Sequence, residues 1–206
     1  MTALSVLPST SVLILAGGRG ARVNGQDKGL LPWRGRPMVA HLHQQVRALT
    51  DDLIISCNRN AEIYTRWADR LATDEQPGFP GPMAGLCAGL ALARHSRILV
   101  LPCDVPGMDQ ALVLQMLAQQ AQVPGVPLAL RQGGHWEPLL CVLPCSAREA
   151  FEMAWRQGER SPRRVLQALG TLALDCPAGD ARLGNLNTLE LIQNQPAPES
   201  GTDVPV

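Results

Sequence analysis

The stretch SVLILAGGRGAR, residues 11–22, decides the fold of this chain. Its first five residues, Ser11–Leu15, form an apolar run that predicts a short buried strand. Gly17, Gly18 and Gly20 follow at once and predict a loop. In open α/β sheets, ligands bind beyond the carboxyl ends of the strands. The stretch therefore predicts an α/β fold with a candidate ligand-binding loop after its first strand.

Further apolar runs alternate with segments of helical spacing through the first half of the chain. The expected strands are Ser11–Leu15, Leu53–Cys57 and Arg97–Leu101, and the expected helices are Pro37–Leu49, Arg59–Leu71, Met83–Arg94 and Gln110–Ala121. Short buried strands that alternate with helices form βαβ units. The pattern therefore predicts a mostly parallel sheet.

The second half of the chain changes character. Val126–Arg131 and Trp136–Leu143 flank Gln132-Gly133-Gly134-His135, which predicts a small hairpin. The remaining expected elements are helices at Ala147–Arg156, Pro162–Leu169 and Thr188–Gln193 and a strand at Thr171–Leu174. From residue 194 onward Pro, Ser and Gly are frequent, so we expect a disordered tail at 194–206.

The composition limits the classes of function. Lys plus Arg equals Asp plus Glu at 18 each, so no net charge attracts nucleic acid or an anionic membrane, and neither is expected as a partner. The six cysteines form no C-x-x-C pair, which favours reduced thiols over a zinc site or disulfides. The N-terminus resembles neither a signal peptide nor a membrane span. We expect a cytoplasmic protein.

The glycine loop has the features of a triphosphate cradle. Glycines let a backbone approach a phosphate closely, and successive N–H groups can point at one anion. Arg22 and Lys28 lie close enough in sequence to neutralise such a ligand. The residues around Gly20 match neither a Walker loop nor a dinucleotide fingerprint. A glycine-rich turn without a ligand is the alternative interpretation.

A single acid follows another buried strand. Asp104 stands in PCDVP, residues 102–106, directly after the strand expected at Arg97–Leu101. Mg²⁺ is usually held by one or two carboxylates together with substrate phosphates and waters. We expect Asp104 and the turn that begins at Gly17 to converge on one metal-bound triphosphate. An Asp that starts a turn before Pro106 or caps a helix is the alternative.

Four motifs occur in a fixed order along the chain. They are LAGGRGARVNGQDKGLL at 15–31, PGPMAGL at 80–86, PCDVP at 102–106 and NLNTLEL at 185–191. Together they closely resemble the molybdenum cofactor guanylyltransferase (MobA-type) family, over residues 12–192. The chain departs from the family pattern at Val23-Asn24-Gly25, often Met-Gly-Gly, and at Leu189, usually Pro.

The resemblance implies a fold and a reaction. The fold is a Rossmann-like nucleotidyltransferase with helices on both faces of its sheet. It forms one domain over 1–193, with a nucleotide-binding half at about 11–122 and an acceptor-binding half at about 123–193. The reaction transfers GMP from GTP to the terminal phosphate of molybdenum-molybdopterin and releases pyrophosphate, with Mg²⁺ as cofactor. Transient contacts with molybdoenzymes or cofactor chaperones would follow.

Three other functions remain open on the sequence. Cytidylyl transfer to molybdopterin and activation of a sugar phosphate share the first motif. A carrier that binds the cofactor without catalysis belongs to another class, and it leaves the pairing of Lys28 with Asp104 unexplained.

The resemblance also assigns site residues. The nucleotide-binding positions are Leu15, Ala16, Gly17, Lys28, Asn58, Asp74 and Asp104. Asp104 matches the metal ligand, and Lys28 and Arg22 would balance charge on the leaving group, which makes these three the expected catalytic residues. Asn185 and Asn187 are the acceptor candidates, because amides suit the edge of a pterin. For Asn187, a helix cap is the alternative. Arg160, Arg163 and Arg164 favour a solvated helix start over a phosphate site.

Overall fold

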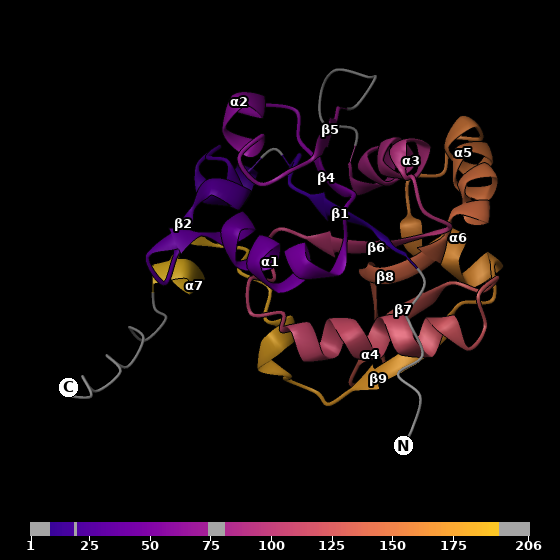
Figure 1. Cartoon of the computed structure of the whole chain (residues 1–206). Helices are drawn as coiled ribbons and strands as arrows, with labels where there is room; N and C mark the ends of the chain where they lie inside the picture. Colours follow the sequence, from indigo (N-terminus) through magenta and orange to yellow (C-terminus); the bar gives the residue numbers. More distant parts are fainter. Residues whose placement is uncertain (1–8, 19, 74–80, 194–206) are drawn as a thin grey trace.

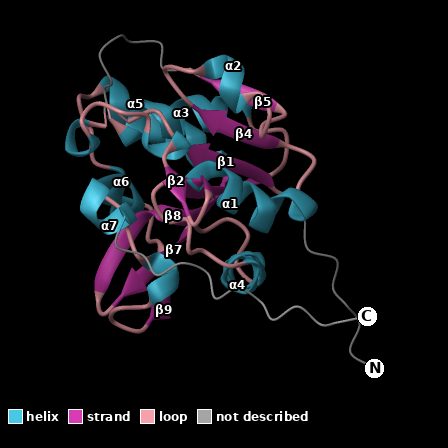
Figure 2. Ribbon diagram, turned by 90° about the vertical axis from the view of Figure 1, so that its left-hand side faces the viewer, coloured by secondary structure: helices cyan, strands magenta, loops and turns pink. Residues whose placement is uncertain are grey.

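One seven-stranded sheet forms the centre of the molecule, in the order β5-β4-β1-β6-β8-β7-β9. The computed structural model describes residues 9–18, 20–73 and 81–193, with the backbone alone at Arg22, Leu189 and Gln193. The strands are Ser11–Leu15 (β1), Leu53–Ser56 (β4), Arg70–Ala72 (β5), Arg97–Pro102 (β6), Leu128–Gln132 (β7), His135–Pro144 (β8) and Leu172–Cys176 (β9). Figure 2 shows the sheet from β5 and β4 at one end to β7 and β9 at the other.

The sheet is mostly parallel, as the sequence predicts. β5, β4, β1 and β6 pair in parallel, and β9 pairs in parallel with β7. β8 runs antiparallel to both β6 and β7. Gly133 and Gly134 form the tight turn between β7 and β8 with φ of 53° and 85°, a conformation that favours glycine. The predicted hairpin is therefore confirmed.

Helices cover both faces of the sheet (Figure 1). α1 (Met38–Val46) and α4 (Gln110–Ala121) pack on one face, while α3 (Pro82–Leu92), α5 (Arg148–Arg156) and α6 (Pro162–Ala168) pack on the other. Alternate residues of β1 divide between the two cores, with Ile14 facing α1 and α4 and Leu13 facing α3. Both side chains are fully buried, which explains why this strand is apolar throughout.

Small residues let α3 lie directly against the sheet. A Cβ atom at Gly89 would stand 2.3 Å from the Leu13 Cδ2 atom, and one at Gly85 would stand 2.7 Å from the Ser56 hydroxyl. Both distances are too short for real contacts. The close approach brings the start of α3 beside the carboxyl ends of β1 and β4, where the site lies.

The helix predicted at Arg59–Leu71 is wrong over most of its length. The helix there, α2, covers only Ala61–Tyr64, and Arg70–Ala72 is the edge strand β5. Asn60 has a left-handed backbone with φ of 53°, so no helix can pass through it. β5 is held by its parallel pairing with β4, a long-range contact that local spacing does not reveal.

Several short elements were not predicted. They are β2 (Pro32–Trp33) and β3 (Arg36–Pro37), which form a ribbon of two residues a strand, and five short 3₁₀ helices. The helix predicted at Thr188–Gln193 is confirmed as α7 (Leu189–Gln193), which packs beside β2 (Figure 1). Short 3₁₀ helices occupy Ala21–Val23, Lys28–Leu30, Arg47–Leu49, Cys145–Ala147 and Ala181–Leu183.

The six cysteines are all free thiols, as expected. Burial raises the pKa of the Cys57 thiol to about 11, so this thiol stays protonated at neutral pH. Within the ranges that the structure describes, no helix has both the length and the apolar character needed to cross a bilayer.

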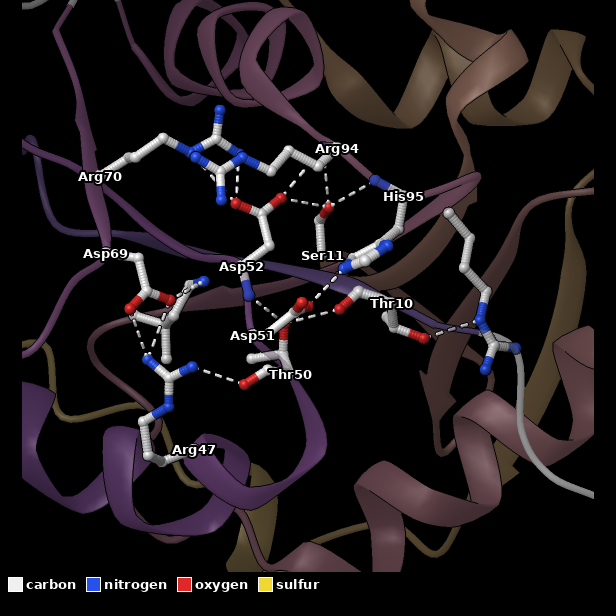
Figure 3. Close-up of polar contacts among 12 residues, drawn as sticks. Thr10, Ser11, Arg47, Thr50, Asp51, Asp52, Asp69, Arg70, Arg94 and His95 are labelled. Atoms are coloured by element: carbon white, nitrogen blue, oxygen red, sulfur yellow. Dashed lines mark hydrogen bonds and ion pairs between the residues drawn. The ribbon is translucent and has the colours of Figure 1, made fainter.

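A polar network closes the amino-terminal ends of the strands, opposite the glycine loop (Figure 3). The Asp52 carboxylate is fully buried and accepts hydrogen bonds from the Ser11 hydroxyl at 2.6 Å, from the Arg94 amide at 3.0 Å and from Arg70. The network joins the strand that begins at Ser11, the loop before β4 and the end of α3. It therefore fixes the register of the sheet at this end.

Candidate active site

The carboxyl ends of β1, β4 and β6 open into a cavity of about 750 Å³. We call it the loop cavity, because described residues of the glycine loop, which we define as 17–26, form one wall. Its other walls come from the end of β4, the start of α3, the end of β6 and the segment before α7. The lining residues are Leu15, Gly17, Gly18, Gly20, Ala21, Val23, Lys28, Ser56, Gly81, Pro82, Gly85, Pro102, Cys103, Asp104, Leu139 and Asn187.

Three polar side chains meet in the loop cavity from distant parts of the sequence. The Lys28 ammonium donates to the Asp104 Oδ2 atom at 2.7 Å and to the Asn187 Oδ1 atom at 2.5 Å. The Lys28 and Asp104 side chains are each 16% exposed, so the pair is partly screened from water but open to a ligand. The Leu186 amide donates to the Asp104 carbonyl at 2.9 Å, which fixes the segment of Asn187 to the end of β6. The turn that begins at Gly17 and the Asp104 carboxylate therefore line one cavity, while their convergence on a metal-bound triphosphate stays a prediction.

The second oxygen of Asp104 is suited to a cation. Among the described residues, Asp104 Oδ1 is buried and has no hydrogen-bond partner, while Oδ2 is bound by Lys28. An unpartnered buried carboxylate oxygen is costly unless a ligand completes it. No group of three or more His, Cys, Asp or Glu side chains in the described ranges could hold a metal alone. The site thus fits Mg²⁺ that takes one protein carboxylate and the rest of its ligands from phosphates and water.

The residues after β1 and β4 shape the floor of the cavity. Leu15 and Gly17 line it, while Ala16 is buried and its amide donates to the Ser56 carbonyl at 2.8 Å. The Asn58 amide donates weakly to the Gly17 carbonyl at 3.5 Å. A Cβ atom at Gly17 would stand 3.1 Å from Asn58 Nδ2, so a side chain there would crowd the loop against β4.

Two of the expected site residues lie outside the part of the chain that the structure describes. They are Asp74 and the side chain of Arg22, although the backbone of Arg22 is part of the 3₁₀ helix Ala21–Val23. Asn24, where the family often has glycine, takes a left-handed backbone with φ of 54°. Asn tolerates this conformation better than most residues, so Asn24 suits this turn of the loop.

A second cavity of about 480 Å³ lies beside the first, and we call it the hairpin cavity because β8 forms one wall. The two cavities share Pro102, Asp104 and Leu139. The hairpin cavity is otherwise lined by Val105, Gln132, Glu137, Pro138, Leu140, Gly179, Asp180, Ala181, Leu183, Gly184 and Asn185. Asp104 therefore stands at the boundary between two spaces, each large enough for part of a substrate.

The hairpin cavity has an acidic, amide-rich wall. Burial and the nearby Asp104 carboxylate raise the pKa of Glu137. Hydrogen bonding from Arg182 lowers the pKa of Asp180, which therefore keeps its charge. Asn185 lines this cavity, whereas Asn187 lines the loop cavity and binds Lys28. The two asparagines expected to bind the acceptor thus face different cavities.

The arginines near residue 161 contribute to neither cavity. The Arg160 guanidinium stacks over the Trp155 ring at 3.7 Å, and Arg164 pairs with Glu159 at 3.2 Å. Arg163 lines a separate small cavity beside Trp136. These positions favour the interpretation of a solvated helix start.

Sequence reasoning missed the polar cluster behind the glycine loop. Asp27 is 8% exposed and accepts hydrogen bonds from the Tyr64 hydroxyl at 2.6 Å and from the Asn60 amide at 2.9 Å. Burial, together with that hydrogen bond, raises the pKa of Tyr64 far above its usual value. Arg59 completes the cluster, with its Nε atom 3.7 Å from Asp27 Oδ2. Its signal in the sequence is an arginine three residues after β4, the strand that pairs with β1.

The chain is similar in sequence to several known proteins. The profile of a family described as MobA-like NTP transferase domain matches residues 12–173. Molybdenum cofactor guanylyltransferase of Pseudomonas aeruginosa (strain LESB58) is 56% identical over 92% of this chain and 96% of its own length. The corresponding protein of Ectopseudomonas mendocina (strain ymp) is 52% identical over 88% of this chain and 89% of its own.

Solved structures share the fold at low sequence identity. Molybdopterin-guanine dinucleotide biosynthesis protein A from Archaeoglobus fulgidus superposes with a TM-score of 0.71 at 20% identity, over 89% of this chain and 95% of that one. A 2-C-methyl-D-erythritol 4-phosphate cytidylyltransferase from Thermus thermophilus superposes with a TM-score of 0.65 at 17% identity, over 86% and 92%.

Proposed function

This chain belongs to the molybdenum cofactor guanylyltransferases of the MobA-like NTP transferase family, and on that premise we propose that it transfers GMP from GTP to the terminal phosphate of molybdenum-molybdopterin. The products are the molybdopterin guanine dinucleotide cofactor and pyrophosphate. One observation carries this proposal beyond family membership: two cavities meet at the Asp104 carboxylate. A transferase that joins two large substrates needs two such spaces with a shared reacting point.

GTP fits the loop cavity. The glycine loop supplies backbone that can approach phosphates closely, and Lys28 supplies positive charge at the same wall. Leu15, Gly17, Lys28 and Asp104 are the nucleotide-site residues that the cavity gathers. Asp104 would hold Mg²⁺, which would neutralise charge on the triphosphate. The Asp104 Oδ1 atom, which no described residue contacts by a hydrogen bond, supports this assignment.

The acceptor fits the hairpin cavity. Its lining amides, Asn185 and Gln132, offer donors and acceptors for the edge of a pterin. The terminal phosphate of the acceptor would then lie toward Asp104, at the boundary of the two cavities. Asn187 would act on the nucleotide side, because it already holds Lys28.

The chemical step needs alignment and charge neutralisation more than proton transfer. An oxygen of the acceptor phosphate attacks the α-phosphorus of GTP, and the bond from that phosphorus to pyrophosphate breaks. A phosphate monoester is already anionic at pH 7, because its second pKa is about 6. No general base is therefore required, and Lys28 balances the charge that builds on pyrophosphate.

The direct test is pyrophosphate release by the purified protein. We expect release with GTP, Mg²⁺ and molybdenum-molybdopterin together, and little with CTP in place of GTP or with the acceptor omitted. Faster release with CTP would assign the protein to cytidylyl transfer. Binding of the acceptor without pyrophosphate release under any nucleotide would make it a carrier.

The six free thiols support a reducing, cytoplasmic location for this reaction. Transient contacts with molybdoenzymes or cofactor chaperones belong to the same proposal, because the product must reach the enzymes that use it.

Gly20→Ala should weaken GTP binding by at least about tenfold. Gly20 has φ of +66°, and a Cβ atom there would stand 2.0 Å from the Gln26 carbonyl oxygen. The loop can accept alanine only by moving, and the left-handed backbone adds about 1–2 kcal/mol of strain. Calorimetric titration with GTP and Mg²⁺ measures the effect.

Gly25→Ala is the matched control, because Gly25 has φ of +74° but no atom within 4 Å of the added Cβ. Gly25→Ala has the same strain of a left-handed backbone, but its added Cβ atom clashes with no other atom. Equal GTP affinity in the two variants would show that the packing of Gly20 against Gln26 is irrelevant to the nucleotide.

A further inference from the structure

Arg59 holds both ends of the glycine loop with one guanidinium. Its Nη1 atom donates to the Gly25 carbonyl at 2.6 Å. Its Nη2 atom donates to the Gly18 carbonyl at 3.2 Å and to the Gln26 carbonyl at 2.7 Å. Gly18 belongs to the beginning of the loop, and Gly25 and Gln26 belong to its end. One side chain that follows β4 thus ties the two ends of the loop together.

We propose that Arg59 is a positioning residue that keeps the glycine loop in the shape that receives the triphosphate. The inference rests on the proposed function, since it takes the loop cavity as the nucleotide site. Arg59 does not line that cavity, so its effect must pass through the loop backbone.

The direction of the peptide groups explains how these hydrogen bonds prepare the loop to bind a phosphate. The Gly17 carbonyl is turned toward Asn58 and the Gly18 carbonyl toward Arg59, both residues that follow β4. A trans peptide group points its N–H away from its C=O, so the Gly18 N–H is directed away from Asn58. Side chains behind the loop therefore bind carbonyls at its start and leave the Gly18 N–H for the ligand.

The Arg59 guanidinium is itself fixed in place. Its side chain is 27% exposed, and its charge lies 3.7 Å from the Asp27 carboxylate, which is only 5% exposed. Asp27 is held in turn by Tyr64 and Asn60. Gly20 packs against the same group, since a Cβ atom there would stand 3.1 Å from Arg59 Nη2. A planar fork with several donors can make these contacts together, whereas a lysine ammonium cannot reach both ends of the loop.

The test compares Arg59→Lys and Arg59→Met with the wild-type protein. We expect both variants to bind GTP with Mg²⁺ at least tenfold more weakly, because binding must then order the loop. Turnover at saturating GTP should change less than threefold, since Lys28 and Asp104 stay paired.

Hydrogen exchange should accelerate at the amides of residues 20–26 and stay unchanged in β1 and β6. Guanidinium ion should restore part of the GTP affinity of Arg59→Ala.

Arg47→Met is the matched control. Like Arg59, Arg47 contacts a carboxylate and a backbone carbonyl. It donates to Asp69 Oδ1 at 3.0 Å, to Asp69 Oδ2 at 2.9 Å and to the Thr50 carbonyl. It lies at the other end of the strands from the glycine loop (Figure 3). It should leave GTP affinity unchanged.

Two results would overturn the role of Arg59. One is wild-type GTP affinity in Arg59→Lys, and the other is faster exchange throughout the sheet instead of in the loop alone. Failure of the wild-type protein to bind GTP would instead contradict the proposed function. Exchange at residues 20–26 would still decide whether Arg59 holds the loop.

Discussion

Replacing Asp104 by alanine should lower the rate of pyrophosphate release by about a thousandfold, comparable to the loss of a single strong electrostatic contact in other enzymes. Asp104 stands where the two cavities meet, and its Oδ1 atom is the buried oxygen available to a cation. Without the carboxylate, the proposed metal would lose its protein ligand and Lys28 would lose its charged partner while keeping Asn187. The same assay with GTP, Mg²⁺ and molybdenum-molybdopterin measures the loss.

The design of that experiment separates chemistry from folding. Asp104→Asn keeps the size of the side chain and removes its charge, so it should be nearly as inactive as the alanine variant. Asp175→Asn is the control, since Asp175 is an exposed acid that pairs with Arg131 on the far side of the hairpin strands. Thermal denaturation should show similar melting temperatures for all three. Wild-type turnover in Asp104→Asn would remove the carboxylate from the mechanism.

Replacing Asp52 by asparagine should destabilise the fold by about 3 kcal/mol, at the lower end of the cost of breaking a buried ion pair, because Arg70 keeps some contact with water. The variant leaves Arg70 without its charged partner and weakens the bonds from Ser11 and the Arg94 amide. Urea denaturation measures the free energy of unfolding. Asp51→Asn is the control: its side chain is 85% exposed and pairs with His95, so stability should stay close to wild type.

The same network predicts how stability depends on pH. Burial alone would raise the pKa of Asp52, but hydrogen bonds from Ser11, the Arg94 amide and Arg70 outweigh burial and hold the pKa below 3.8. A carboxyl group with a lowered pKa stabilises the folded state fully above the pKa of the unfolded chain. That contribution is lost as pH falls through the lower folded pKa. Wild type should therefore lose stability below about pH 4 more steeply than Asp52→Asn.

The sequence predicted those parts of the fold that depend on local pattern. The strand at Ser11–Leu15 and the helix at Gln110–Ala121 are confirmed to the residue, because apolar spacing alone distinguishes them. β5 was missed because its three residues are held only by pairing with β4. The ribbon of β2 and β3 is shorter still, and no periodicity can develop over two residues.

In the site too, the sequence predicts what local pattern determines and misses what depends on long-range contacts. Lys28 and Asp104 could be placed together in advance, since both follow strands or loops at one edge of a parallel sheet. The contact of Asn187 with Lys28 could not, because the path of the chain before α7 is irregular. Arg59 was assigned to a helix, and its real task depends on three backbone carbonyls that no side-chain pattern encodes.

The shared wall of the two cavities has a consequence for the step that limits the steady-state rate of the enzyme. With the nucleotide in the loop cavity and the acceptor in the hairpin cavity, as proposed, a finished dinucleotide would occupy both spaces and be bound at two ends. Each end would then stay close to its site while the other dissociates. Its residence time should exceed that of either substrate, and departure should limit the steady-state rate. Rapid mixing should then reveal a burst of pyrophosphate in the first turnover, whereas a linear start would mean that bond formation sets the pace.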